Sequence, residues 1–243
     1  MEDASPSFDE RLQQAKLDAM KELAYGASHE INNPLANISA RAQTLLRDEQ
    51  NPERRRLLEA IHQQALRAHE MISDLMLFAR PPQLNRQMTD LPRLVETVLA
   101  ELQADCAGRD IRLACRVPGD LPTVHGDPIQ LAVALKALCQ NAIEAAGRDG
   151  KVEVTASMAA GAPPAAPALR IDVADDGPGV SPAVRPHLFD PFFSGREAGR
   201  GLGFGLSKAW RIVEQHGGRL WLDESGEPGA KFIIELPLSD PPS

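Results

Sequence analysis

Apolar residues in the first third of the chain recur at alternating steps of three and four, as they do along a coiled coil. One extra step of four interrupts the first run, between Ile31 and Leu35. The positions of this run are Leu17, Met20, Ala24, Ala27, Ile31, Leu35, Ile38, Ala42 and Leu45. The spacing predicts an amphipathic helix with a coiled-coil seam that contains a single stutter.

A second run keeps the same spacing without interruption, at Leu58, Ile61, Ala65, Ala68, Ile72, Leu75 and Ala79. Between the runs, Asn51 can cap a helix and Pro52 can take its first position. The two runs therefore predict a helical hairpin over residues 12–82, after a polar tail of residues 1–11. Because two helices cannot fully bury such a seam on each other, we expect a homodimer that forms a four-helix bundle.

Beyond the hairpin the pattern changes to mixed helix and strand. Pro81 and Pro82 remove backbone donors and predict the end of the second helix, followed by a linker over residues 83–90. Helices are predicted over residues 91–107, 128–147 and 207–216, and strands at "IRLACRV", "KVEVTASM", "ALRIDVAD", "GRLWLDE" and "AKFIIELPL". The fold class is α+β: after the hairpin, an α/β sandwich over residues 91–239 with a mixed, largely antiparallel sheet, then a tail of residues 240–243.

The composition limits which partners and which cellular location we expect for this chain. The formal net charge of -8 argues against a nucleic-acid partner, whose binding surface would be basic. No apolar run approaches the roughly 20 residues that cross a bilayer, and "MEDASPSFDERLQQ" lacks the order of a secretory signal. The three cysteines lack metal-ligand spacing, which favours reduced thiols. We expect a cytoplasmic chain with no membrane segment.

A polar cluster, "SHEINNP", interrupts the first apolar run. His29 is turned by about 200° from the seam residue Ala27, so it should face solvent, with Glu30 beside it and Asn33 one turn further along. Pro34 lacks an amide hydrogen and leaves the carbonyl of Glu30 without its helical partner, which predicts a bend. An idle surface histidine and a kink that only shapes packing are the alternatives to a functional site.

The second domain carries two further polar interruptions. Asn141 lies inside an apolar helix, where its amide either bonds to the backbone or donates an oxygen to a magnesium ion. The sequence "DVADDGPGVS" follows a strand and holds a D-x-G-x-G pattern at Asp175, Gly177 and Gly179. An aspartate at a strand end can accept from an adenine amine while glycines allow close approach, although such a loop can also be only a tight turn.

A glycine run precedes the last predicted helix, at Gly199, Gly201, Gly203 and Gly205. Free amides and the positive end of the helix dipole suit a polyphosphate there. A dinucleotide-binding reading fails because an aromatic-proline turn, "LFDPFF", precedes the run instead of the first strand of a βαβ unit. The preceding polar segment predicts a lid with Arg196 and Arg200 near phosphates, unless these arginines are solvated surface charges.

The cluster at residues 29–35 resembles the phospho-acceptor box of sensor histidine kinases, H-E-x-x-N-P-L, in His29, Glu30, Asn33, Pro34 and Leu35. The resemblance implies that His29 takes the γ-phosphoryl group of ATP on a ring nitrogen. It implies that Glu30 orients the imidazole and accepts its proton. It also implies that Asn33 positions water for dephosphorylation of a partner regulator.

The later motifs, in their order, resemble the ATP-binding domain shared by histidine kinases, gyrase, Hsp90 and the mismatch-repair ATPases. The resemblance implies that Asn141 holds Mg²⁺, that Asp175 binds adenine and that Arg148 supplies a cation near the phosphates. The other nucleotide-binding positions that it implies are Glu144, Gly177, Gly179, Phe193, Arg200, Gly201, Leu202, Gly203, Gly205 and Leu206. The chain departs from the pattern at Ala137, where many kinases have a second asparagine, and at Phe204, where leucine is common.

Together the motifs predict the dimeric core of a two-component kinase that uses ATP and Mg²⁺ to phosphorylate His29. The phosphoryl group would pass to an aspartate of a response-regulator receiver domain. Two other classes remain open on the sequence alone. One is an interaction module that binds nucleotide without autophosphorylation, and the other acts mainly as a phosphatase through Asn33.

Overall fold

The structure is a computed structural model that describes residues 30–79, 82–159, 167–190, 193, 203–223 and 228–238. The chain divides into two compact units, Met1–Pro82 and Gln83–Ser243. Each unit is described by itself. None of the helices in the described part of the chain combines the length and apolar character that crossing a membrane requires.

The first unit is the predicted helical hairpin. Residues 30–48 are helical, and after a short turn α2 runs over Pro52–Ala79. Asn51 caps α2, because its Oδ1 accepts from the backbone amides of Glu53 and Arg54 at 3.0 and 3.1 Å. The predicted cap and the first helical position are confirmed. The predicted end of this helix at Pro81 and Pro82 involves residues 80 and 81, which lie outside the described residues. The predicted seam before residue 30 lies outside the described residues.

The seam of the hairpin is only partly covered within one chain. Ala42 and Ala65 are 3% and 5% exposed, so they pack between the two helices. The larger seam residues Ile38, Leu45 and Ile61 are 45%, 60% and 48% exposed. The described residues of the hairpin therefore leave an apolar face uncovered. Burial of such side chains would contribute about 1.5–3 kcal/mol each.

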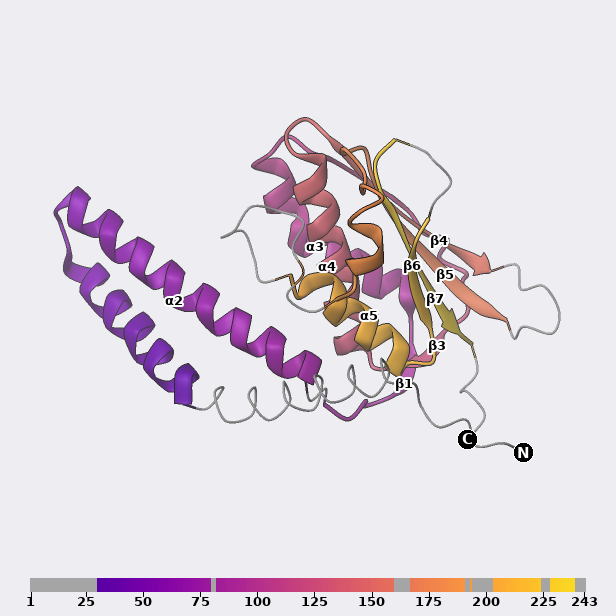
Figure 1. Cartoon of the computed structure of the whole chain (residues 1–243), viewed down its shortest axis with the longest axis horizontal. Helices are drawn as coiled ribbons and strands as arrows, with labels where there is room; N and C mark the ends of the chain where they lie inside the picture. The colour runs from indigo at the N-terminus through magenta and orange to yellow at the C-terminus, as the bar shows by residue number, and fades with distance from the viewer. Residues whose placement is uncertain are drawn as a thin grey trace. The chain divides into compact units, whose positions relative to one another are not determined.

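The second unit is a sheet covered by helices on one face (Figure 1). The five-stranded sheet has the order β2-β4-β5-β7-β6, in which only β2 and β4 are parallel neighbours. Its strands are β2 Arg112–Arg116, β4 Lys151–Ala159, β5 Ala168–Asp175, β6 Arg219–Leu222 and β7 Lys231–Pro237. The helices are α3 Leu91–Ala107, α4 Pro128–Ala146 and α5 Gly205–Gln215. The predicted α+β class and largely antiparallel sheet are confirmed.

Three local features differ from the prediction. Gln87–Thr89 form β1, which pairs with β3, Val124–Gly126, so this part of the predicted linker over residues 83–90 is a strand. Strands of three residues are too short to show the alternation that identifies a strand in a sequence. The last helix begins at Gly205, two residues before the predicted start. A short 3-10 turn, Arg185–His187, was also not predicted.

The core lies between the sheet and the three helices. Its most fully buried large side chains include Leu102 of α3, Leu138 of α4, Leu169 of β5 and Phe232 of β7. All three cysteines are free, and burial raises the pKa of the Cys139 thiol to about 12. That thiol therefore serves packing and carries no reactive thiolate at neutral pH.

A buried hydrogen-bond network ties the start of α4 to the end of α5. Oδ1 of Asp127 caps α4, and its Oδ2 accepts from the amide of Asn85 at 2.9 Å. The amide of Asp127 donates to Nε2 of His216 at 2.9 Å, and Nδ1 of His216 donates to the carbonyl of Ile212 at 2.8 Å. We call this network the Asp127–His216 clasp. It requires a neutral imidazole, because Nε2 must accept.

The clasp predicts that acid destabilises the second unit. Burial of His216 lowers the pKa of its imidazole in the folded state. In the unfolded chain the ring takes up a proton as the pH falls below about 6.5, so unfolding binds a proton and becomes more favourable. Urea unfolding of the full chain between pH 7.5 and 5 should therefore show falling stability, and His216→Gln should flatten that slope.

The matched control is His187→Gln, which alters an exposed histidine of the same unit. The control should leave the slope in place. A slope that is equally steep in His216→Gln would show that another group controls the acid response.

Candidate functional site

Asp175 ends β5 with its side chain inside the protein. The residue is 6% exposed, and its Oδ1 accepts from the amides of Gly177 at 2.9 Å and Ala230 at 3.4 Å. Its Oδ2 is buried and has no hydrogen-bond partner among the described residues. A buried carboxylate oxygen without a donor is unfavourable, so this atom is suited to accept an N–H from a ligand.

Burial also sets the charge properties of this carboxyl. Desolvation raises the pKa of Asp175, while the amides of Gly177 and Ala230 act in the opposite direction. The two amides thus stabilise the ionised form on one oxygen only. The other oxygen can accept a hydrogen bond from an amino group such as that of adenine. This arrangement fits the sequence prediction that Asp175 binds adenine.

The glycines after Asp175 bring its loop against α4. A Cβ on Gly177 would lie 2.5 Å from the carbonyl oxygen of Ala145, so no side chain fits at this position. Gly179 has a φ of 72° and lies against the backbone of Gly229. The D-x-G-x-G loop is therefore fixed beside the second half of α4.

The second half of α4 carries the other predicted polar positions. Asn141 is half-buried and Glu144 is exposed, three residues further along the helix. Arg148 is exposed just after the helix ends. Because Asn141 lies one turn before Ala145, it shares the helix face that contacts the Gly177 loop. The structure thus brings the Asn141 and Asp175 motifs together, although they are 34 positions apart in the sequence.

The oxygen donors at this face suit a hard cation such as Mg²⁺. Within the described ranges, no group of three His, Cys, Asp or Glu side chains could hold a metal ion by itself. A cation at Asn141 would therefore need additional ligands, which the phosphates of a nucleotide can provide.

Gly203 and Gly205, the described glycines of the glycine run, form a tight turn that leads into α5. Gly203 has a φ of 71°, and a Cβ there would collide with the backbone of Phe193. Gly205 and Leu206 open α5, where the first amides of a helix have no intrahelical acceptor. Phe193 and Gly203 thus lie next to each other at the start of α5, and α5 packs against α4.

Several predicted residues cannot be placed. His29, Arg200, Gly201 and Leu202 lie outside the described residues. Glu30 and Asn33 are exposed on the helix of residues 30–48, which belongs to the first unit.

Sequence reasoning missed two residues that complete the Asp175 environment. Besides the amide of Ala230, its carbonyl oxygen takes part by accepting from the amide of Asp175 at 2.9 Å. Gly229 has a φ of 90°, and a Cβ there would collide with the carbonyl of Asp175. The only signal in the sequence is the Pro-Gly pair in "EPGA" before the last strand, which marks a turn without revealing its contact.

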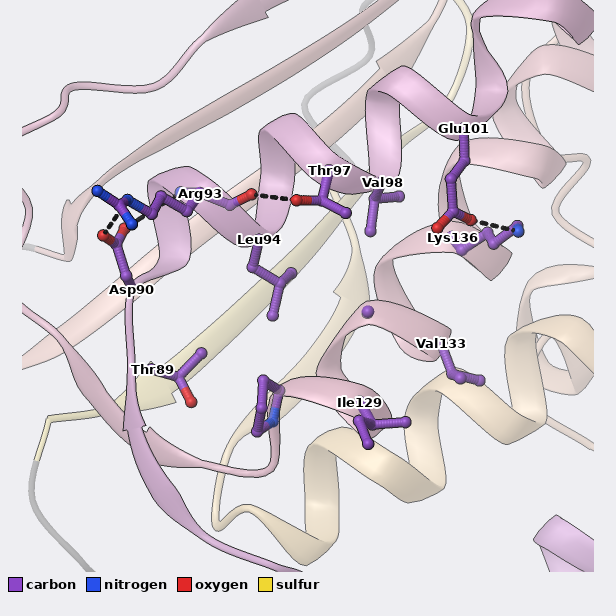
Figure 2. Close-up of a pocket in the computed structure, with 12 residues that line it drawn as sticks. Thr89, Asp90, Arg93, Leu94, Thr97, Val98, Glu101, Ile129, Val133 and Lys136 are labelled. Atoms are coloured by element: carbon purple, nitrogen blue, oxygen red, sulfur yellow. Dashed lines mark hydrogen bonds and ion pairs between the residues drawn. The ribbon is translucent and has the colours of Figure 1, made fainter.

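A separate groove lies between the first halves of α3 and α4 (Figure 2). Its volume is about 550 Å³, and Leu94, Val98, Ile129 and Val133 form its apolar lining. Ion pairs at its rim join Arg93 to Asp90 and Lys136 to Glu101, at 3.4 and 2.7 Å. The groove residues of α4 lie between positions 128 and 136, so the groove is separate from the site that contains Asn141.

Comparison with known proteins identifies two family domains in this order. Residues 19–84 match the His Kinase A (phospho-acceptor) domain, and residues 126–240 match the histidine kinase-, DNA gyrase B- and HSP90-like ATPase. The two matches cover most of the chain and place an acceptor domain before an ATPase domain. This chain belongs to the histidine kinases.

Curated relatives of this histidine kinase core are longer proteins. Sensor histidine kinase ZraS of Escherichia coli O157:H7 is 33% identical over 232 residues, which are 95% of this chain and 49% of ZraS. Sensory histidine kinase/phosphatase NtrB of the same strain is 31% identical over 237 residues, which are 94% of this chain and 65% of NtrB. The kinase core thus spans about half the length of ZraS.

Among solved structures, full-length ShkA in complex with AMPPNP superimposes with a TM-score of 0.77 and 26% identity. The match covers 91% of this chain and 47% of ShkA. The likeness confirms the architecture of a histidine kinase core.

The two departures from the family pattern are both core residues. Ala137 is 8% exposed and Phe204 is 2% exposed. Both side chains contribute to packing of the kinase core around α4 and the start of α5, and neither adds a polar group to the site.

Asp175→Asn should uncouple nucleotide binding from folding. The amide keeps an oxygen for Gly177 and Ala230 but replaces the acceptor Oδ2, so ATP affinity should fall on the order of 100-fold. Thermal stability should be equal or higher, because the substitution removes a buried carboxylate. Titration calorimetry with ATP and a thermal melt measure the two effects.

The matched control is Asp172→Asn in the same strand. Asp172 pairs with Arg170 at 2.6 and 3.0 Å, away from the strand end, so this variant should retain ATP affinity. Unchanged affinity in Asp175→Asn would refute the assignment of Asp175 to the adenine site.

Proposed function

We propose that this kinase core transfers the γ-phosphoryl group of ATP to His29 and then to an aspartate of a response-regulator receiver domain. One observation supports the proposed ATP site above all others. Asp175 presents a buried oxygen without a described partner, its loop packs against α4, and the chain also carries the His29 motif. The ShkA complex with AMPPNP, an ATP analogue, supports a nucleotide at this fold.

The proposed roles of the ATP site follow from its donors and acceptors. Asp175 accepts from the adenine amine, and Gly177 and Gly179 let its loop pack closely against α4 and Gly229, which fixes the position of this carboxylate. The first amides of α5 donate to the phosphates, and Arg148 and Arg200 add positive charge near them. These groups act by positioning and by charge neutralisation, which dominate phosphoryl transfer.

Mg²⁺ fits this site, because the side-chain amide oxygen of Asn141 and the phosphates of the nucleotide can serve as its ligands. When bound, the ion would neutralise charge on the phosphates. Glu144, one turn from Asn141 on α4, adds negative charge on the same side of the helix.

The chemical step exchanges one bond for another. A ring nitrogen of His29 forms a bond to the γ-phosphorus while the bond from that phosphorus to the leaving oxygen of ADP breaks. Glu30, exposed beside His29 in the sequence, takes the proton that the imidazole loses. The bond between the ring nitrogen and phosphorus then breaks as the phosphoryl group passes to the receiver carboxylate, and the ring nitrogen takes up a proton again, which regenerates the imidazole.

Regulator dephosphorylation through Asn33 is a second proposed activity. The relative NtrB is named a kinase and phosphatase, and Asn33 is exposed on the acceptor helix, where its amide can orient a water molecule.

A cytoplasmic location is also proposed for this chain, because ATP and a receiver partner are found in the cytoplasm.

A homodimer is proposed from the uncovered seam. The exposed residues Ile38, Leu45 and Ile61 lie on the side predicted to meet a second hairpin. A second copy related by twofold symmetry would cover the same seam on both chains.

The phosphoryl acceptor is tested by incubation with radiolabelled ATP and Mg²⁺. The label should be stable in base and labile in acid, as expected for a phosphohistidine, and it should be lost in His29→Ala. Label that survives this substitution would contradict the assignment of His29.

The dimer is tested by Ile38→Asp. The substitution places two carboxylates in the proposed seam, so it should raise the dimer dissociation constant by at least about 100-fold. Sedimentation equilibrium measures this constant, and Met88→Asp is the control, because Met88 is 66% exposed in the second unit. An unchanged dimer in Ile38→Asp would place the interface elsewhere.

A further inference from the structure

Among the described residues, three hydrogen bonds join the helix of residues 30–48 to α2 at intervals of seven residues. They connect Asn32 to His69 at 3.0 Å, Ser39 to His62 at 2.9 Å and the carbonyl of Leu46 to Arg55 at 3.4 Å. The residue numbers rise by seven along the first helix and fall by seven along α2. The contacts therefore follow one side of the antiparallel pair, and we call them the polar ladder.

The first contact of the polar ladder lies in a turn that has lost one of its own hydrogen bonds. Residues 30–48 stay helical through Pro34, which has no amide hydrogen to donate to the carbonyl of Glu30. Asn32 lies between these two residues. Ser39 lies five residues beyond Pro34, where no proline interrupts the helix. The contact at Asn32 thus restrains the weakened turn, and the contact at Ser39 restrains an ordinary one.

The contact also fixes the orientation of an amide in the acceptor motif. Oδ1 of Asn32 accepts from Nδ1 of His69, so the Asn32 amide cannot rotate without loss of this bond. Glu30 and Asn33, which carry the proposed proton transfer and the proposed water, lie within two residues of it. A small displacement of such groups lowers the rate of a reaction that depends on orientation.

We infer that His69 is a positioning residue for the phosphoryl chemistry of the acceptor motif. Through Asn32 it holds the turn that carries Glu30 and Asn33 in its reactive geometry. The inference rests on the proposed function of His29 as the phosphoryl acceptor.

The kinetic test compares two histidines of the same ladder in the full chain. His69→Ala should slow labelling of His29 at saturating ATP roughly 3- to 10-fold, the factor expected for one hydrogen bond, with KM for ATP unchanged. His62→Ala removes the neighbouring contact and should leave the rate within about twofold. His69→Gln keeps an amide donor and should restore most of the rate.

A double-mutant cycle identifies the route of the effect. Asn32→Ala should reproduce the loss seen in His69→Ala, and the double variant should lose no more than either single variant. Equal losses in His69→Ala and His62→Ala would assign the effect to general hairpin stability and overturn the inference. Additive losses would overturn it as well.

Amide hydrogen exchange of residues 30–36 separates this inference from the proposed function. His69→Ala should speed exchange in this turn, and His62→Ala should not. If the unaltered chain fails to label His29, the proposed function is wrong, and the exchange data alone decide whether His69 restrains the turn. Exchange that is unchanged in His69→Ala overturns the inference even in an active kinase.

Discussion

The candidate site of the second unit depends on a carboxylate that the protein buries without a hydrogen-bond partner for each of its oxygens among the described residues. One oxygen of Asp175 receives two backbone amides, and the other has no partner among the described residues. Such a group costs free energy in the free protein, and a ligand that donates to the second oxygen recovers it. The loops around it are built for close backbone approach, at Gly177 on one side and Gly229 on the other.

The long elements could be predicted because their signals are local. The helix at residues 91–107 and the strands β4 and β5 show their period within their own residues. The strands β1 and β3 could not be predicted, because each has three residues and becomes a strand only by pairing across the chain. Their formation depends on a register that no local pattern contains.

The site residues also divide into those with a local sequence signal and those that depend on contacts between distant parts of the chain. Asp175 could be predicted because Gly177 and Gly179 follow it within four residues at the end of an apolar strand. The contribution of Ala230 could not, since its contact with Asp175 joins residues 55 positions apart. The pairing of Asn32 with His69 depends on the register of two helices, which is fixed by the length of the turn and the packing of Ala42 and Ala65.

The Asp127–His216 clasp also fixes where the second unit begins. Asn85 is already bonded to Asp127, and β1 starts two residues later. Residues 85–89 therefore belong to the ATPase fold and do not act as a free linker. A domain boundary drawn after them would remove one hydrogen bond of the clasp and one strand of the two-stranded sheet.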